Sequence, residues 1–147
     1  MQLRYFDAKH HLDTDAVREI MLAVLPHPNV EMLDHLLERY RVDDSMQLLG
    51  ALDGDEQLVA VAGLRVEENE TATILHLRVA DEFRRRGIGR AIVRKVIAHH
   101  GLRSVAARCP EDLLSFYTAI GFTHWLIGEK PPGRKWYGVR WRQPELS

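Results

Sequence analysis

The sequence has one cysteine, Cys109, and no long apolar run. A single thiol cannot close an internal disulfide, and the paired cysteine and histidine spacings of a zinc site are absent. No stretch approaches the roughly 20 apolar residues that a membrane span requires, and the first residues lack the apolar core of a signal peptide. We therefore expect a cytoplasmic protein with no membrane partner and no metal.

Charge of one sign is not in excess, because 20 Lys and Arg residues stand against 21 Asp and Glu. The field of the whole molecule therefore gives no reason to expect a nucleic acid as partner. Hydrophobic residues make up 46% and charged residues 28% of the chain, which is typical of a globular domain. No repeat or linker divides the sequence, so residues 1–147 are expected to form a single domain.

Hydrophobic periodicity predicts the element order β-α-α-β-β-β-α-β-α-β-β, a fold of the α+β class. Strands are expected at residues 2–7, 46–52, 58–66, 72–79, 104–108, 122–128 and 135–142. Helices are expected along the apolar stripes 17–24 and 30–40, from about 89 to 100, and from 111 to 120. Strand alternation predicts that Leu75, Leu77 and Val79 share one face.

The segment 79–91 joins the end of an apolar strand to the start of an amphipathic helix. A helix start carries unpaired backbone N–H groups and a partial positive charge, and both attract phosphate. Gly87 and Gly89 remove side chains that would block close approach, and the three arginines at 84–86 add groups suited to phosphate oxygens. The spacing fits neither the dinucleotide fingerprint nor the P-loop. The segment predicts a diphosphate site of another kind.

Residues 84–89, Arg-Arg-Arg-Gly-Ile-Gly, fit the pattern Arg/Gln-x-x-Gly-x-Gly/Ala of the GCN5-related N-acetyltransferase (GNAT) superfamily. In that family a strand-ending valine stands five residues before the pattern, as Val79 does here. The family's second motif, Phe-Tyr-x-x-x-Gly-Phe, is matched by residues 116–122. The chain thus resembles GNAT enzymes over nearly its whole length, although residues 1–70 match only in element order.

The resemblance implies a mixed, mostly antiparallel central sheet with helices on both faces, in which the strands 72–79 and 104–108 splay to open a V-shaped cleft. It implies an N-acetyltransferase that moves an acetyl group from acetyl-CoA to a primary amine of a small molecule or peptide, by direct attack in a ternary complex. The family's usual acid for the leaving thiolate corresponds to Tyr117. The residues implied to hold CoA are Leu77, Arg78, Val79, Arg84, Arg85, Arg86, Gly87, Ile88, Gly89 and Arg90.

Packing alone could also explain Tyr117, because Leu113, Phe116, Tyr117 and Ile120 form one helical stripe. The general base is unassigned, since Thr73 stands where the histone-modifying branch of the family has a glutamate. The titratable side chains nearest to this position in sequence are Glu67, Glu68, Glu70 and His76. Pro110 replaces an asparagine that contacts the cofactor in many relatives. Cys109 is expected to be a buried structural thiol rather than a nucleophile.

Two other functions stay open at this point. One is a non-catalytic acyl-CoA-binding module that keeps the pocket without turnover. The other is a nucleic-acid contact through residues 84–86 with Arg134, Lys135, Arg140 and Arg142, against which the neutral net charge counts. The acyl acceptor is unassigned, and the oligomeric state is open as well, although homodimers are common in the family.

Overall fold

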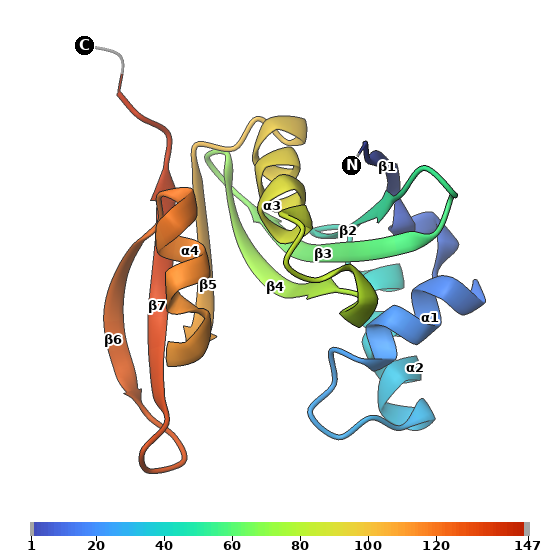
Figure 1. Ribbon diagram of the computed structural model, residues 1–147, viewed down its shortest axis with the longest axis horizontal. Helices are drawn as coiled ribbons and strands as arrows, with labels where there is room; N and C mark the ends of the chain where they lie inside the picture. The colour runs from blue at the N-terminus through green and yellow to red at the C-terminus, as the bar shows by residue number, and fades with distance from the viewer. Residues whose placement is uncertain (1, 146–147) are drawn as a thin grey trace.

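Seven strands form one sheet in the order β1-β2-β3-β4-β5-β7-β6 (Figure 1). The computed structural model describes residues 2–145. The strands are β1 (Arg4–Asp7), β2 (Met46–Leu52), β3 (Leu58–Glu67), β4 (Thr71–Val79), β5 (Ser104–Pro110), β6 (Thr123–Glu129) and β7 (Lys135–Arg142). Neighbouring strands run antiparallel except β4 and β5, which are parallel. The predicted mixed, mostly antiparallel sheet is confirmed.

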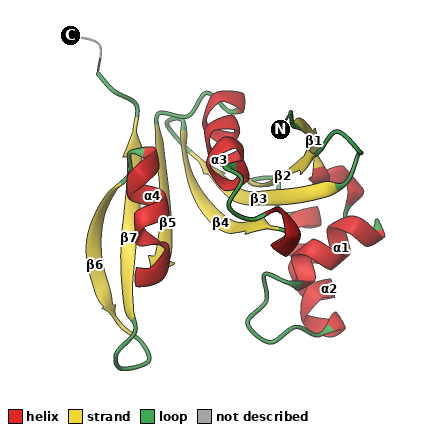
Figure 2. Cartoon of the chain, in the orientation of Figure 1, coloured by secondary structure: helices red, strands yellow, loops and turns green. Residues whose placement is uncertain are grey.

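Four α-helices complete the fold (Figure 2). They are α1 (Asp15–Leu22), α2 (Val30–Val42), α3 (Ile88–His99) and α4 (Leu114–Ile120), with 3-10 turns η1 (Ala8–His11), η2 (Asp81–Phe83) and η3 (Glu111–Leu113). The predicted order of strands and helices is therefore confirmed. None of the helices within residues 2–145 is long and apolar enough to cross a membrane.

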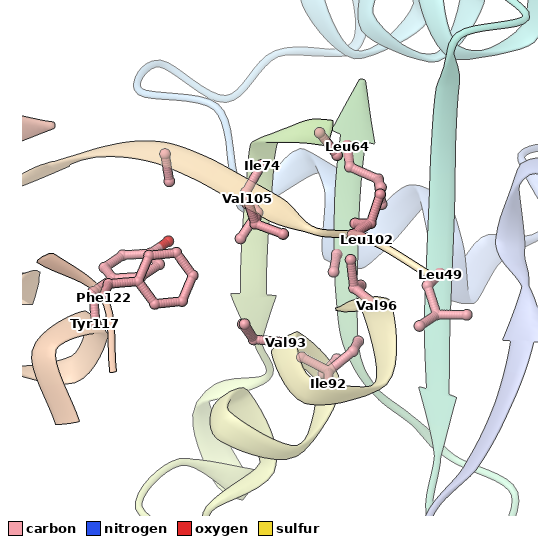
Figure 3. Packing of buried hydrophobic residues seen from close by; sticks show 14 of the residues in the cluster. Leu49, Leu64, Ile74, Ile92, Val93, Val96, Leu102, Val105, Tyr117 and Phe122 are labelled. Carbon is pink, nitrogen blue, oxygen red and sulfur yellow. The ribbon is translucent and has the colours of Figure 1, made fainter. Parts of the chain in front are cut away.

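The two faces of the sheet bury separate apolar clusters, as binary patterning requires. On one face α3 and α4 pack against the sheet, and Ile92, Val93 and Val96 project from α3 toward the strands (Figure 3). On the other face α1 and α2 pack against β2 and β3 through Met21, Leu37 and their neighbours. Helices thus flank both faces of the sheet.

A β-bulge in β4 changes which residues share a face. Gly63 pairs with His76 and Leu64 pairs with Ile74, so Leu75 is the extra residue without a partner on β3. Leu77 and Val79 pack in the cluster under α3, whereas Leu75 packs in the cluster on the opposite face. The prediction of one shared face was therefore wrong for Leu75, because a bulge shifts the alternation by one residue.

The predicted helix at 111–120 is divided into two parts. Residues 111–113 form the turn η3, and Leu113 has φ −100° and ψ −2°, which depart from α-helical values. Leu113 is consequently 48% exposed and does not extend the stripe of Phe116, Tyr117 and Ile120. On α2 the predicted stripe residue Val30 is likewise exposed at 62%, and Leu36 joins the buried side instead.

The strands β4 and β5 are paired at one end only. Thr71, Ala72 and Thr73 pair with Ser104, Val105 and Ala106, and no further β4–β5 pairs follow among the described residues. Beyond residue 73 the two strands diverge, as the ribbon shows (Figure 1). The splay predicted between these strands is present, and it leaves one edge of residues 77–79 without a neighbouring strand.

Candidate active site

A cleft of about 560 Å³ lies where β4 and β5 separate. Residues 74–79 of β4 form one wall, and Arg108 and Cys109 of β5 stand on the other. The segment from η2 into α3 contributes Phe83, Arg84, Arg85, Gly87, Ile88, Gly89 and Arg90, and the η3–α4 segment contributes Leu113, Phe116 and Tyr117. The cleft therefore brings together both motif segments, which are about 30 residues apart in sequence.

Ten of the eleven predicted site residues line this cleft: Leu77, Arg78, Val79, Arg84, Arg85, Gly87, Ile88, Gly89, Arg90 and Tyr117. Arg86 is the exception. Its guanidinium lies 5.3 Å from the centroid of the Phe83 ring, a cation–π contact that supports a residue of the cleft wall. The sequence pattern did not distinguish Arg86 from Arg84 and Arg85, because only the backbone conformation of the loop decides which of the three side chains faces the cleft.

The loop before α3 is wound so that its side chains do not close the helix end. Arg85 has φ 65° and Gly87 has φ 77°, both in the left-handed region. Gly87 is the N-cap of α3 and supplies no side-chain hydrogen bond. The first N–H groups of a helix have no partner within it, so those of Ile88, Gly89 and Arg90 remain available to an anion at this end of the cleft.

The two glycines serve different purposes. A Cβ at Gly87 would meet nothing within 4 Å, so glycine is favoured there by the positive φ and not by lack of space. A Cβ at Gly89 would lie 3.0 Å from Cε1 of Phe116. Gly89 is thus also needed for the close packing of α3 against α4, which joins the two motif segments and which the spacing alone does not reveal.

Ion pairs hold part of the arginine cluster. Asp81 accepts a hydrogen bond from Arg78 at 2.9 Å and pairs with Arg84 at 3.2 Å. Because all three groups are partly exposed, these pairs contribute little to stability. They do fix two guanidinium groups beside the start of α3, where positive charge gathers.

Tyr117 is buried on the α4 side of the cleft. Its ring meets Phe116 edge-on at a centroid distance of 5.0 Å and Phe122 at 5.2 Å, and Figure 3 shows Tyr117 beside Phe122. Burial, with a smaller contribution from neighbouring Cys109, raises the pKa of Tyr117 above its ordinary value of 10.0. The phenol therefore keeps its proton at neutral pH and can act as a hydrogen-bond or proton donor.

Cys109 lines the cleft but is almost fully buried. Burial, followed by the charge of Asp112, raises the pKa of the Cys109 thiol. A thiol in this environment stays protonated and is a poor nucleophile, which favours the structural interpretation of this residue.

A comparison with protein-family models matches residues 14–122 to the acetyltransferase (GNAT) family. The chain belongs to this family. Its solved structural neighbours include a Bacillus subtilis acetyltransferase in complex with CoA, with TM-score 0.72, 19% identity, and coverage of 97% of this chain and 100% of that chain. Spermidine/spermine N-acetyltransferase from Vibrio cholerae has TM-score 0.70, 14% identity, and coverage of 97% and 95%.

A third neighbour, the IAA acetyltransferase from Bacillus cereus, has TM-score 0.71, 14% identity, and coverage of 97% of this chain and 100% of that chain. At these identities the likeness establishes the GNAT fold alone. A comparison with curated proteins found no match.

In this GNAT domain a hydrogen-bonded pair, Tyr40 and the partly buried His76, lies beside the β4 bulge. The Tyr40 hydroxyl is 2.6 Å from Nδ1 of His76, and His76 lines the cleft. Burial, with a smaller effect of Arg39, lowers the pKa of His76 to about 4, and burial raises that of Tyr40. Since the imidazole is neutral and the phenol protonated, the hydroxyl can donate to Nδ1, which leaves the hydrogen on Nε2. In that tautomer Nε2 has no free lone pair for an amine proton, whereas in the other tautomer, with Nδ1–H donating to the Tyr40 oxygen, the Nε2 lone pair is free.

The carboxylates nearest in sequence to the family's base position lie outside the cleft. Glu67 accepts a hydrogen bond from Thr73 at 2.6 Å, and Glu70 pairs with Arg103 at 3.1 Å. Neither these residues nor Glu68 lines the cleft, and neither does Pro110. The general base of this GNAT domain stays unassigned.

Sequence reasoning missed Tyr40 and Arg108. Tyr40 was predicted only as part of a core stripe, and its pairing with His76 depends on the bulge. Arg108 is the last residue of the strand predicted at 104–108. Its sequence neighbours Ala107 and Cys109 are buried, whereas Arg108 is exposed. A charged residue between two apolar ones on a strand was the available signal.

Proposed function

We propose that this GNAT domain is an N-acetyltransferase that moves an acetyl group from acetyl-CoA to a primary amine. The observation that carries the proposal is the single cleft that joins an open helix start, five arginines and a buried tyrosine. The structural neighbours do not indicate the acceptor, because they include acetyltransferases described for different compounds.

The residues present fit the donor chemically. The uncapped start of α3 offers backbone N–H groups to a diphosphate, and Arg84, Arg85 and Arg90 line the same end of the cleft. The unpaired edge of residues 77–79 offers backbone groups to the amides of the pantetheine arm. When bound, acetyl-CoA would supply the acyl group as a thioester and leave as a thiol.

Tyr117 is proposed to protonate the departing thiolate. Its hydroxyl is on a cleft-lining residue, and its raised pKa keeps the proton on the phenol before transfer. The thiolate takes that proton, and the phenolate regains one from solvent or from the acceptor's ammonium. Direct transfer needs no acyl-enzyme, which agrees with the protonated state of Cys109.

Two measurements on the same preparation test the proposal. Isothermal titration at low salt should show CoA binding, and thiol release from acetyl-CoA should be sustained with at least one amine of a broad panel. Without CoA binding the proposal fails entirely. CoA binding without any amine-dependent thiol release would instead identify a non-catalytic acyl-CoA-binding module.

A further inference from the structure

The charged side chains of the cleft are of one sign. Arg78, Arg84, Arg85, Arg90 and Arg108 line it, and among the described residues no Asp or Glu does. Arg78 and Arg84 are already paired with Asp81, and a bound diphosphate would offset the charge at the start of α3, so the charge that an acceptor meets is that of Arg108. A polycationic acceptor would be repelled there, whereas an acceptor with a negative charge near its amine would be attracted.

Arg108 stands apart from the other four arginines. The register pairs Ala106 with Thr73, so Arg108 is level with Leu75, near the point where β4 and β5 separate. Val79 is four residues further along β4, which is about 13 Å at the usual rise per residue. The start of α3 lies beyond Val79. Arg108 is thus nearer to the point where the strands separate than to a diphosphate held at that helix start, which leaves its guanidinium for another group.

Arg108 is also free of internal partners in the described part of the chain. Arg78 and Arg84 pair with Asp81, whereas Arg108 has no carboxylate within 4.0 Å among residues 2–145. Strand alternation directs its side chain to the opposite face of the sheet from Cys109, which packs in the cluster under α3 and α4. His76, on the facing wall, is neutral and does not oppose an anion there.

We propose that Arg108 binds a carboxylate of the acceptor, so that the substrate is a free amino acid or a similar amine with a nearby carboxylate, rather than a polyamine or a peptide N-terminus. One guanidinium matches one carboxylate through two parallel hydrogen bonds. The inference rests on the proposed acetyltransferase function, since it concerns the acceptor end of that cleft.

The test compares matched acceptors. For several common amino acids, thiol release is measured with the amino acid, with its carboxamide and with the corresponding amine that lacks the carboxyl group. Each rate is divided by the concentration of unprotonated amine, so that differences in amine pKa do not affect the comparison. Wild-type protein should prefer the carboxylate by about 10- to 100-fold in kcat/KM, the effect expected of one charge-assisted pair. Arg108→Gln should abolish this preference, chiefly through KM, while the Kd for CoA stays the same.

Arg142→Gln is the matched control, because Arg142 is an exposed arginine at the end of β7 that does not line the cleft. It should keep the wild-type preference. Equal use of acids and amides, a preference that survives Arg108→Gln, or no turnover of any amino acid by protein that binds CoA would each overturn the inference. Turnover of other amines in the last case would leave the proposed function standing, whereas failure to bind CoA would remove both.

Discussion

At the scale of the residue, Tyr117 is where chemistry and packing predict opposite results. Tyr117→Phe keeps the ring contacts with Phe116 and Phe122 and deletes only the hydroxyl. If that hydroxyl protonates the thiolate, kcat should fall by roughly 100-fold while the affinity for acetyl-CoA changes little. A residue that only packs should lose at most about 1–2 kcal/mol of stability and turn over normally.

The comparison requires single-turnover rates, because slow product release can hide a chemical defect. Tyr137→Phe is the control: Tyr137 packs partly buried against the same apolar cluster but does not line the cleft. A Tyr117→Phe enzyme as fast as the Tyr137→Phe enzyme would exclude the acid role.

His76 makes stability depend on pH. Its pKa is about 4 in the folded protein against 6.5 ordinarily, so the unfolded chain binds more protons between these values and stability falls as pH decreases from 6.5 to 4. The full difference corresponds to about 3 kcal/mol. Urea unfolding at pH 7, 6, 5 and 4 measures it, with His76→Gln as the variant that cannot titrate.

Burial also lowers the pKa of His100, but this residue contributes equally to both proteins. The difference between their free energies of unfolding at each pH therefore reports on His76 alone. The His76→Gln profile should be the shallower one across this window. Parallel profiles would show that the pKa of His76 is not depressed.

At the scale of the element, the packing of α3 on α4 can be tested through Gly89. Gly89→Val should force the Phe116 ring to move and lower the free energy of unfolding by about 1–3 kcal/mol, with weaker CoA binding. Phe116→Leu makes room for the new side chain. In the Phe116→Leu background, Gly89→Val should therefore lower the free energy of unfolding much less than it does in the wild type. A double-mutant cycle from chemical denaturation measures this coupling.

Gly87→Ala provides the contrast. Its Cβ would meet nothing, and its cost of about 1–2 kcal/mol comes from the left-handed backbone at φ 77°. Phe116→Leu should therefore leave the Gly87→Ala loss unchanged. If both glycine variants respond alike to Phe116→Leu, the distinction between a steric and a conformational glycine is wrong.

The elements themselves were predictable from local pattern, and the exceptions have local causes. The sequence pattern predicted every strand and helix, and β7 was predicted with its exact bounds, Lys135–Arg142. Most of these elements bury one face, whereas β6 is exposed along nearly its whole length. The bulge at Leu75 and the turn at Leu113 were not predictable, since both depend on how a strand or helix meets its neighbours. The motif segments could be found in the sequence, but the separation of Arg108 from the other arginines follows only from the β4–β5 register.

At the scale of the molecule, the two halves of the sheet are joined weakly. β4 and β5 share three residue pairs, and the cleft beyond them is lined from both sides. A ligand that binds across the cleft adds contacts between the halves that exist only in the folded state. Hydrogen exchange of residues 77–79 and 107–109 should consequently slow on CoA binding more than that of β1 and β2.

Thermal unfolding should register the same event. At a CoA concentration of 100 times its Kd, mass action contributes about 2.7 kcal/mol, which for a chain of this size raises Tm by about 5–10 °C.

Arg90→Gln should reduce this increase in Tm at equal CoA concentration, because the diphosphate loses a cation at the start of α3. Arg94→Gln, an exposed arginine one turn later on the same helix and outside the cleft, should not. Added salt should lower the increase for the wild type and for Arg94→Gln, and less for Arg90→Gln, since screening acts on the charge contact that this variant lacks. An equal increase in all three proteins at every salt concentration would place the diphosphate away from the start of α3.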